Sequence, residues 1–171
     1  MVEVLQRCGV TAIPLPCRVL VFNQIYSDWV HANDYRQPNA DELKVLSDKG
    51  AYSVEIGGTG KITNGGFDGH LIALIPTLHF AVDVSIDQAD RPLKGIKIKE
   101  PFTFDTVDGD FQSGKSTLMA GTDFGCIWYK VIDTAAYKTS GDWIEKDRTR
   151  RLIEMTFTRA RTELKRHGIT L

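Results

Sequence analysis

Cysteine is scarce in this chain of 171 residues, which contains only Cys8, Cys17 and Cys126. Their scattered spacing excludes both a paired disulfide framework and a C-x-x-C metal knuckle. We therefore expect three reduced thiols and a cytoplasmic protein.

Long hydrophobic runs and a large net charge are also missing. The longest apolar stretches, such as HLIALIP, are far shorter than a bilayer-spanning helix, and no signal pattern follows Met1. The net charge is −1, so neither a membrane nor nucleic acid is expected as a partner. Residues 144–167 hold eight Lys or Arg, but four interleaved Asp or Glu favour a solvated face and leave a protein partner possible.

One nucleotide-binding motif is present: GDFQSGKST, residues 109–117, matches the phosphate-loop formula. Such a loop needs a buried strand before it and a helix after it. Here the preceding PFTFDTVD alternates apolar with polar residues, and only STLMA separates Lys115 from Gly121. We predict a loop between antiparallel strands, and nucleotide binding through Gly109–Thr117 is the weakest alternative.

Helix signals lie at both ends and near residue 40. Asn39 and Glu42 match a capping box before a helix that ends at Gly50, and a short N-terminal helix with no N-cap residue ends at Gly9. Asp142 and Glu145 form a second possible capping box, and a long amphipathic helix is expected after it. This helix ends at Gly168, and its apolar stripe consists of Ile153, Phe157, Ala160 and Leu164.

Strand signals separate these helices. Six segments are rich in β-branched or aromatic residues and are bounded by turn residues: 17–23, 51–57, 70–76, 79–86, 95–100 and 126–133. The glycine-rich stretch 57–69 is expected to be a flexible loop. The predicted fold is α+β, with an antiparallel sheet, a truncated N-terminal helix and the long C-terminal helix packed on the sheet, in a single domain of residues 1–171.

His70 and Asp83 are the candidate site residues. A hairpin whose loop is either residues 76–77 or residues 75–78 pairs position 70 directly with position 83, which places both side chains on one face. The apolar side of the second strand, opposite Asp83, is then formed by Phe80, Val82, Val84 and Ile86. The pair is either a structural hydrogen bond or a general base supported by a carboxylate.

The segments LQRCGVTAIPLPCRV and GHLIALIPTLHFAVDVSIDQADRP resemble the transglutaminase-like/papain-like cysteine enzymes and, locally, the arylamine N-acetyltransferases. The resemblance covers residues 2–92. It implies a thiol-dependent hydrolase or acyl/amide transferase in which His70 is the catalytic histidine and Asp83 the catalytic aspartate. The family's cysteine falls before Met1, so the first helix is expected to lack its start.

The resemblance implies a small-molecule or peptide substrate and no cofactor. The stretch 57–69 is expected to border the cleft, and Trp29, Trp128 and Trp143 are candidates for an apolar substrate wall. His79, Asp83 and Asp87 would share one strand face but lie about 13 Å from one to the next, with no second histidine pair, so no metal site is expected.

None of the three thiols suits a nucleophile. Cys8 falls at the C-terminal end of its helix, where the helix dipole disfavours a thiolate, and Cys17 and Cys126 lie in apolar strands. The alternative function is therefore a non-catalytic binding or regulatory module built on the same fold.

Overall fold

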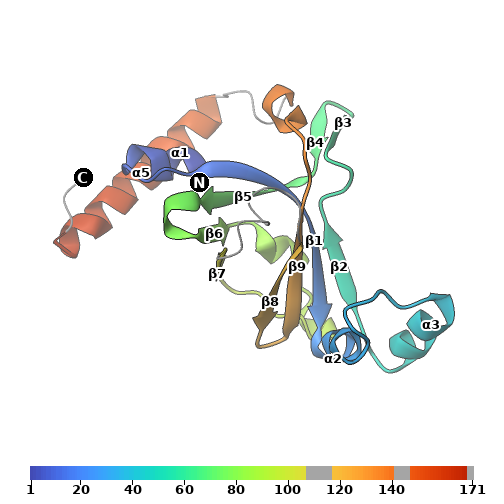
Figure 1. Cartoon of the computed structure of the whole chain (residues 1–171). Coiled ribbons are helices and arrows are strands. Elements are labelled where there is room, and N and C mark those ends of the chain that lie inside the picture. The colour runs from blue at the N-terminus through green and yellow to red at the C-terminus, as the bar shows by residue number, and fades with distance from the viewer. Residues whose placement is uncertain (107–116, 141–146, 169–171) are drawn as a thin grey trace.

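The computed structural model describes residues 1–106, 117–140 and 147–168 (Figure 1). Within these ranges no helix combines the length and apolar character needed to cross a membrane. The helices and strands run in the order α1 Val2–Arg7, β1 Ile13–Asn23, α2 Gln24–Ala32, α3 Ala40–Asp48, β2 Ser53–Ile56, β3 Lys61–Thr63, β4 Gly66–Asp68, β5 His70–Ile75, β6 Phe80–Asp83, β7 Phe102–Asp105, β8 Thr117–Thr122, β9 Gly125–Val131 and α5 Asp147–Arg166.

An antiparallel sheet organises these elements, with the strand order β7-β6-β5-β1-β9-β8, and β2 pairs with β1 outside that path. The α+β class is confirmed. Strand β1 is central because its first half pairs with β5 and its second half with both β9 and β2. Pro14 and Pro16, which have no N–H to donate to a strand ladder, fall in the half that pairs with β5 alone.

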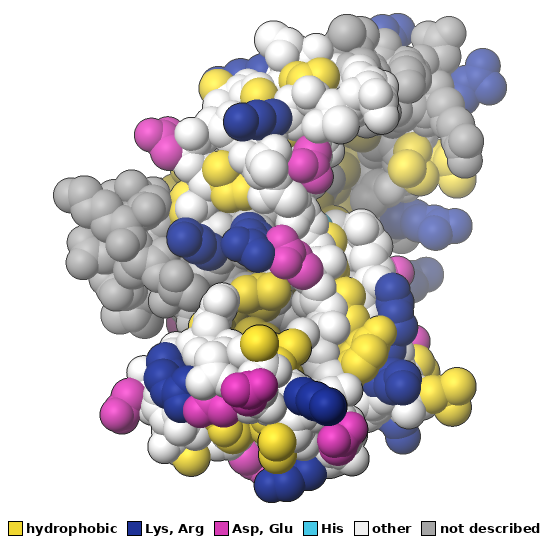
Figure 2. Space-filling model, turned by 90° about the vertical axis from the view of Figure 1, so that its right-hand side faces the viewer, with side chains coloured by type: hydrophobic (Ala, Val, Ile, Leu, Met, Phe, Trp, Pro, Cys, Tyr) yellow, Lys and Arg dark blue, Asp and Glu magenta, His cyan; other side chains and the backbone are white. Residues whose placement is uncertain are grey.

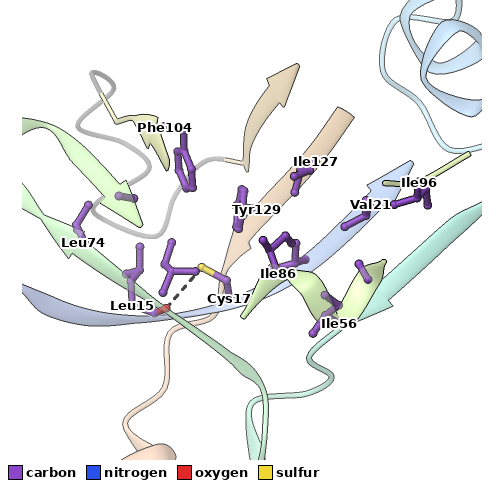
Figure 3. Packing of buried hydrophobic residues seen from close by; sticks show 14 residues of the cluster. Leu15, Cys17, Val21, Ile56, Leu74, Ile86, Ile96, Phe104, Ile127 and Tyr129 are labelled. Atoms are coloured by element: carbon purple, nitrogen blue, oxygen red, sulfur yellow. Dashed lines mark hydrogen bonds between the residues drawn. The ribbon is translucent and has the colours of Figure 1, made fainter. Parts of the chain in front are cut away.

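The sheet curls strongly. Phe104 on β7 stacks on Tyr129 of β9 with ring centroids 4.5 Å apart, although β6, β5 and β1 lie between these two strands in the sheet order. The concave side holds the main core, shown in Figure 3. The segment after β6, with its 3-10 turn Ile86–Ala89, covers this side and contributes Ile86, Ala89 and Ile96 to the core.

The convex side carries a smaller aromatic cluster beneath α2. Phe22 stacks on Tyr26 of α2 at 4.6 Å and meets Trp128 of β9 edge-on at 5.1 Å. Asn23 ends β1 and caps α2, because its side chain accepts a hydrogen bond from the Tyr26 N–H. Helix α2 was not expected from the sequence.

The C-terminal helix α5 forms, but it packs mainly on α1 instead of on the sheet. Figure 1 shows both helices together at one end of the molecule, away from α2 and α3. The expected apolar stripe of Ile153, Phe157, Ala160 and Leu164 is half-buried along α5. Helix α1 ends before Gly9 as predicted, and Gly9 has a φ of +76°.

Two expectations about secondary structure are wrong. Residues 95–100 form no strand and make only an isolated bridge between Ile96 and Arg91. The glycine-rich stretch 57–69 contains the hairpin of β3 and β4, because Asn64 and Gly65 adopt the positive φ angles of a tight hairpin turn.

Residues 109–116 of the phosphate-loop string lie outside the described residues, as do Asp142, Trp143 and Glu145. Strand β8 begins at Thr117, the last residue of the string, in the place where a phosphate-binding loop requires a helix. Strands β7 and β8, which flank the string, lie at opposite ends of the sheet order.

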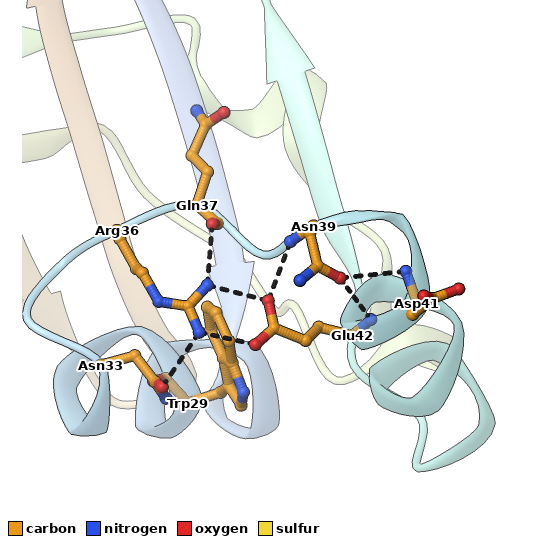
Figure 4. Close-up of polar contacts among 7 residues, drawn as sticks. All are labelled: Trp29, Asn33, Arg36, Gln37, Asn39, Asp41 and Glu42. Carbon is orange, nitrogen blue, oxygen red and sulfur yellow. Dashed lines mark hydrogen bonds and ion pairs between the residues drawn. The ribbon is translucent and has the colours of Figure 1, made fainter.

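Charged side chains of both signs are interspersed on the face of the molecule shown in Figure 2. One organised group of them joins α2 to α3 (Figure 4). The Arg36 guanidinium lies 4.8 Å from the centre of the Trp29 ring and binds both carboxylate oxygens of Glu42, at 2.6 and 2.8 Å. Glu42 also completes the predicted capping box by accepting the Asn39 N–H, while the Asn39 side chain accepts the N–H of Glu42.

These contacts make the stability of the α2–α3 connection depend on pH. Hydrogen bonds from Arg36 and then from the Asn39 N–H lower the pKa of Glu42 from 4.5 to about 2. A carboxyl whose pKa is lower in the folded state stabilises above its unfolded pKa and loses that effect as the pH falls through its folded pKa. In urea unfolding, the stability difference between wild type and Glu42→Gln should therefore be largest above pH 5 and disappear towards pH 2.

Asp41→Asn is the matched control, because it removes a negative charge from the same first turn of α3 without touching Arg36. An equal pH dependence in the two variants would show that general charge at the helix start, and not the Arg36–Glu42 pair, is responsible.

Candidate functional site

His70 is the first residue of β5 and lies on the concave side of the sheet. It pairs across the ladder with Cys17 of β1, and only 4% of its surface is exposed. The backbone that leads into it is closely packed: a Cβ at Gly57 would lie 2.7 Å from the His70 nitrogen and 2.8 Å from the Cys17 carbonyl oxygen. Backbone packing alone therefore fixes the position of the first residue of β5, independently of the contacts of the imidazole.

Asp83 is the last residue of β6 and binds His70. The His70 Nε2 and Asp83 Oδ2 are 2.7 Å apart, and the Asp83 side chain is fully buried. The predicted register is wrong by two residues, because β5 and β6 pair as Leu74↔Ala81 and the turn occupies 76–79. A shift of two keeps both side chains on one face, so the two residues meet diagonally across the ladder.

The side of β6 that is buried was also predicted wrongly. Asp83 shares the concave side with Ala81, and both are completely buried, whereas Val84, expected on the apolar side, is 39% exposed. An acidic side chain therefore lies in the core, where it is stable only if donors surround it.

Three donors satisfy the Asp83 carboxylate. Besides His70, the Tyr129 hydroxyl donates to the same oxygen, Oδ2, at 3.1 Å, and the Ser85 N–H donates to Oδ1 at 3.1 Å. Tyr129 was missed from the sequence. Its signal was the alternation in CIWYKV, which places Tyr129 on one face with Ile127. What the sequence could not show is that the sheet curls enough to bring β9 to β6.

This arrangement fixes the roles of the two imidazole nitrogens. Asp83 accepts hydrogen bonds from Tyr129 and Ser85, and with the carboxylate as acceptor His70 donates to it from Nε2. The neutral imidazole then carries its lone pair on Nδ1, which has no hydrogen-bond partner in the described part of the chain. His70 can therefore accept a proton at Nδ1 while Asp83 stabilises the resulting cation.

A cavity of about 440 Å³ adjoins His70. The glycine-rich stretch borders it, as expected. The rest of its lining comes from the adjoining ends of β2 and β5, from the segment after β6, and from the 3-10 turn Ala136–Thr139 with the following Ser140. Besides His70, the lining includes Gly57, Phe67, Asp68, Ser85, Gln88 and Tyr137.

The expected tryptophan wall is wrong for the two tryptophans that the structure describes. Trp128 lies in the aromatic cluster on the convex side, and Trp29 lies beneath Arg36. Phe67 and Tyr137, with ring centroids 5.9 Å apart, supply the aromatic surface of the cavity instead.

The three thiols are poor nucleophiles in this structure. Cys17 faces His70 across the ladder but is completely buried, and burial followed by the charge of Asp83 raises the pKa of its thiol. Burial also raises the pKa of the Cys126 thiol. Cys8 is half-buried at the C-terminal cap of α1, next to α5 and far along the chain from the cavity residues.

A metal centre finds no support in the described ranges, where no three His, Cys, Asp or Glu side chains gather to hold an ion. His79 adopts a left-handed φ of 49° in the turn before β6, and Asp87 lies in the 3-10 turn Ile86–Ala89. These two residues therefore do not continue the strand face on which Asp83 lies.

Comparison of the chain with protein-family models, with curated proteins and with solved structures gave no match. The site must therefore be interpreted from its own geometry.

Gly57→Ala tests how tightly the backbone supports His70. Gly57 has a φ of +74°, and an added methyl group would press on the His70 nitrogen and the Cys17 carbonyl. Gly65→Ala is the matched control, because Gly65 has a φ of +80° with nothing within 4 Å of an added Cβ. Both variants incur the backbone strain, about 1–2 kcal/mol. We expect Gly57→Ala to lower the free energy of unfolding by at least about 1 kcal/mol more than Gly65→Ala, because only it overpacks. Equal losses in chemical denaturation would contradict this packing.

Proposed function

We propose that His70 and Asp83 form the acid–base part of a transglutaminase-like, thiol-dependent hydrolase or acyl/amide transferase. The observation that carries the proposal is the buried Nε2–Oδ2 hydrogen bond of 2.7 Å beside a cavity of about 440 Å³. The resemblance of residues 2–92 to that superfamily supports it, since it selects the same two residues. A cytoplasmic location is part of the proposal, in keeping with three free cysteines.

The proposed reaction needs both nitrogens of His70. Nδ1 takes the proton of a thiol, and the thiolate attacks the carbonyl carbon of an amide, ester or thioester. The resulting imidazolium returns the proton to the leaving amine, alcohol or thiol, which leaves a thioester on the enzyme. Water or an amine then cleaves this thioester. Asp83 keeps the imidazole in the required tautomer and stabilises its charged form.

The nucleophilic thiol lies outside residues 1–171 in this proposal. Cys17 and Cys126 are buried thiols with raised pKa values, and Cys8 lies at the unfavourable end of a helix. The substrate would be a small molecule or a peptide segment that fits the cavity.

The second candidate is a non-catalytic binding module on the same fold. The same thiol observations favour it, because a chain without a competent nucleophile can still bind a ligand in the cavity beside His70. Here the His70–Asp83 pair is a structural hydrogen bond between β5 and β6.

Thiol labelling of the protein expressed from its complete native gene separates the two candidates. Intact mass before and after complete alkylation of the unfolded protein first shows whether it holds a cysteine beyond Cys8, Cys17 and Cys126. If the enzyme proposal is right, iodoacetamide modifies one further cysteine rapidly near pH 6, and His70→Ala slows that labelling at least about tenfold. A protein with these three cysteines alone, or slow and uniform labelling of all thiols, would overturn the enzyme proposal and leave the binding module as the remaining candidate.

Asp83→Asn tests the carboxylate separately from the imidazole. The amide keeps the size of the side chain but removes its charge and points an N–H₂ group at one of three donors, so we expect folding with about 1–3 kcal/mol less stability. Rapid labelling of the further cysteine should fall towards the rate of His70→Ala. Asp87→Asn, on an exposed carboxylate four residues later, should label like the wild type. Undiminished labelling in Asp83→Asn would remove Asp83 from the proposed mechanism.

A further inference from the structure

The hydrogen bond from Tyr129 to Asp83 joins distant parts of the sheet. Asp83 belongs to β6 and Tyr129 to β9, with β5 and β1 between them in the sheet order. Tyr129 is completely buried. Its ring stacks on Phe104 of β7, with ring centroids 4.5 Å apart and an interplanar angle of 23°. Figure 3 shows the Tyr129 side chain among the concave core residues, beside Phe104.

The phenol and the imidazole share one acceptor atom. Both donate to Oδ2 of Asp83, while the Ser85 N–H binds Oδ1, so each carboxylate oxygen is fixed by a donor other than His70. Rotation of the carboxylate would break the contacts with Tyr129 and Ser85 as well as the contact with His70. A donor that stabilises the ionised carboxylate also makes Oδ2 less basic.

We propose that Tyr129 is a positioning residue for the His70–Asp83 pair, which orients the carboxylate and weakens its pull on the imidazole proton. The inference rests on the proposed function for its catalytic meaning, although the effect on His70 can be measured without any reaction. It differs from a purely structural role, in which the phenol only satisfies its own hydroxyl group in the core.

The Tyr129 hydroxyl is suited to this role because it remains a donor. Burial and then the charge of Asp83 raise the pKa of the phenol, so it stays protonated at neutral pH. The other titratable groups around the pair are Cys17 on β1, which faces His70, and Asp68 and Tyr137, which line the cavity. These three remain unchanged when Tyr129 is replaced.

The test is an NMR titration of the His70 ring, assigned by the loss of its signals in His70→Gln. In Tyr129→Phe the Asp83 carboxylate loses a donor. This loss destabilises the state with a neutral imidazole more than the state with an imidazolium, because the imidazolium itself compensates the charge of the carboxylate. The midpoint of the His70 titration should move to higher pH by about half a unit or more. Tyr26→Phe is the matched control, because Tyr26 is a stacked tyrosine on the convex side of the sheet, and it should leave the midpoint unchanged.

Replacing Tyr129 with 3-fluorotyrosine gives a second measurement if Tyr129→Phe does not fold. The more acidic phenol is a stronger donor, so the midpoint should move to lower pH. An unchanged midpoint in the folded variant overturns the proposal and leaves Tyr129 a structural residue. Because no nucleophile is needed, the result is independent of thiol labelling: a shifted midpoint without rapid labelling would support the role of Tyr129 and count against the enzyme.

Discussion

The relative positions of several strands in this structure depend on one buried carboxylate, that of Asp83. Asp83 is completely removed from water, and an ionised group in that position is strongly destabilising unless donors replace its hydration. Those donors come from three places: the first residue of β5, a tyrosine on β9 and the backbone two residues further on. The carboxylate is satisfied only when β5, β6 and β9 adopt their final relative positions, which couples the site to the complete sheet.

The curl of the sheet is what makes this coupling possible. In a flat sheet, β6 and β9 would be separated by two strands, well beyond the reach of a tyrosine side chain. Here the stacking of Phe104 on Tyr129 closes the concave side, and the segment after β6 fills it with Ile86, Ala89 and Ile96. The apolar packing of the core and the polar network around Asp83 therefore require the same curvature. We infer that each supports the other, as locally consistent interactions do in natural folds.

The arrangement explains why Cys17 is unsuited to chemistry despite its position opposite His70. Burial removes the water that would stabilise a Cys17 thiolate, and the nearby Asp83 carboxylate disfavours a second negative charge. The open side of His70 faces a different set of residues, the cavity bordered by the glycine-rich stretch and by Tyr137. Catalysis or binding is therefore expected at that cavity and away from the core thiol.

Local signals in the sequence determined the elements whose causes are local. The Asn39–Glu42 capping box, the glycine that follows α1 and the β-branched or aromatic runs of β1, β5, β6 and β9 could all be read from short stretches, because caps and strand propensity depend on neighbouring residues. Asn23 as the cap of α2, and Asn64–Gly65 as a hairpin turn, carried equally local signals that were overlooked. The pairing of His70 with Asp83 was predicted despite a wrong register, because an error of two residues preserves the face of a strand. Only the tertiary structure decided which side of β6 is buried, that α5 packs on α1 and that Tyr129 reaches Asp83. Each of these depends on how distant strands and helices approach one another, and the curvature that brings them together comes from the packing of the whole core and from no single segment.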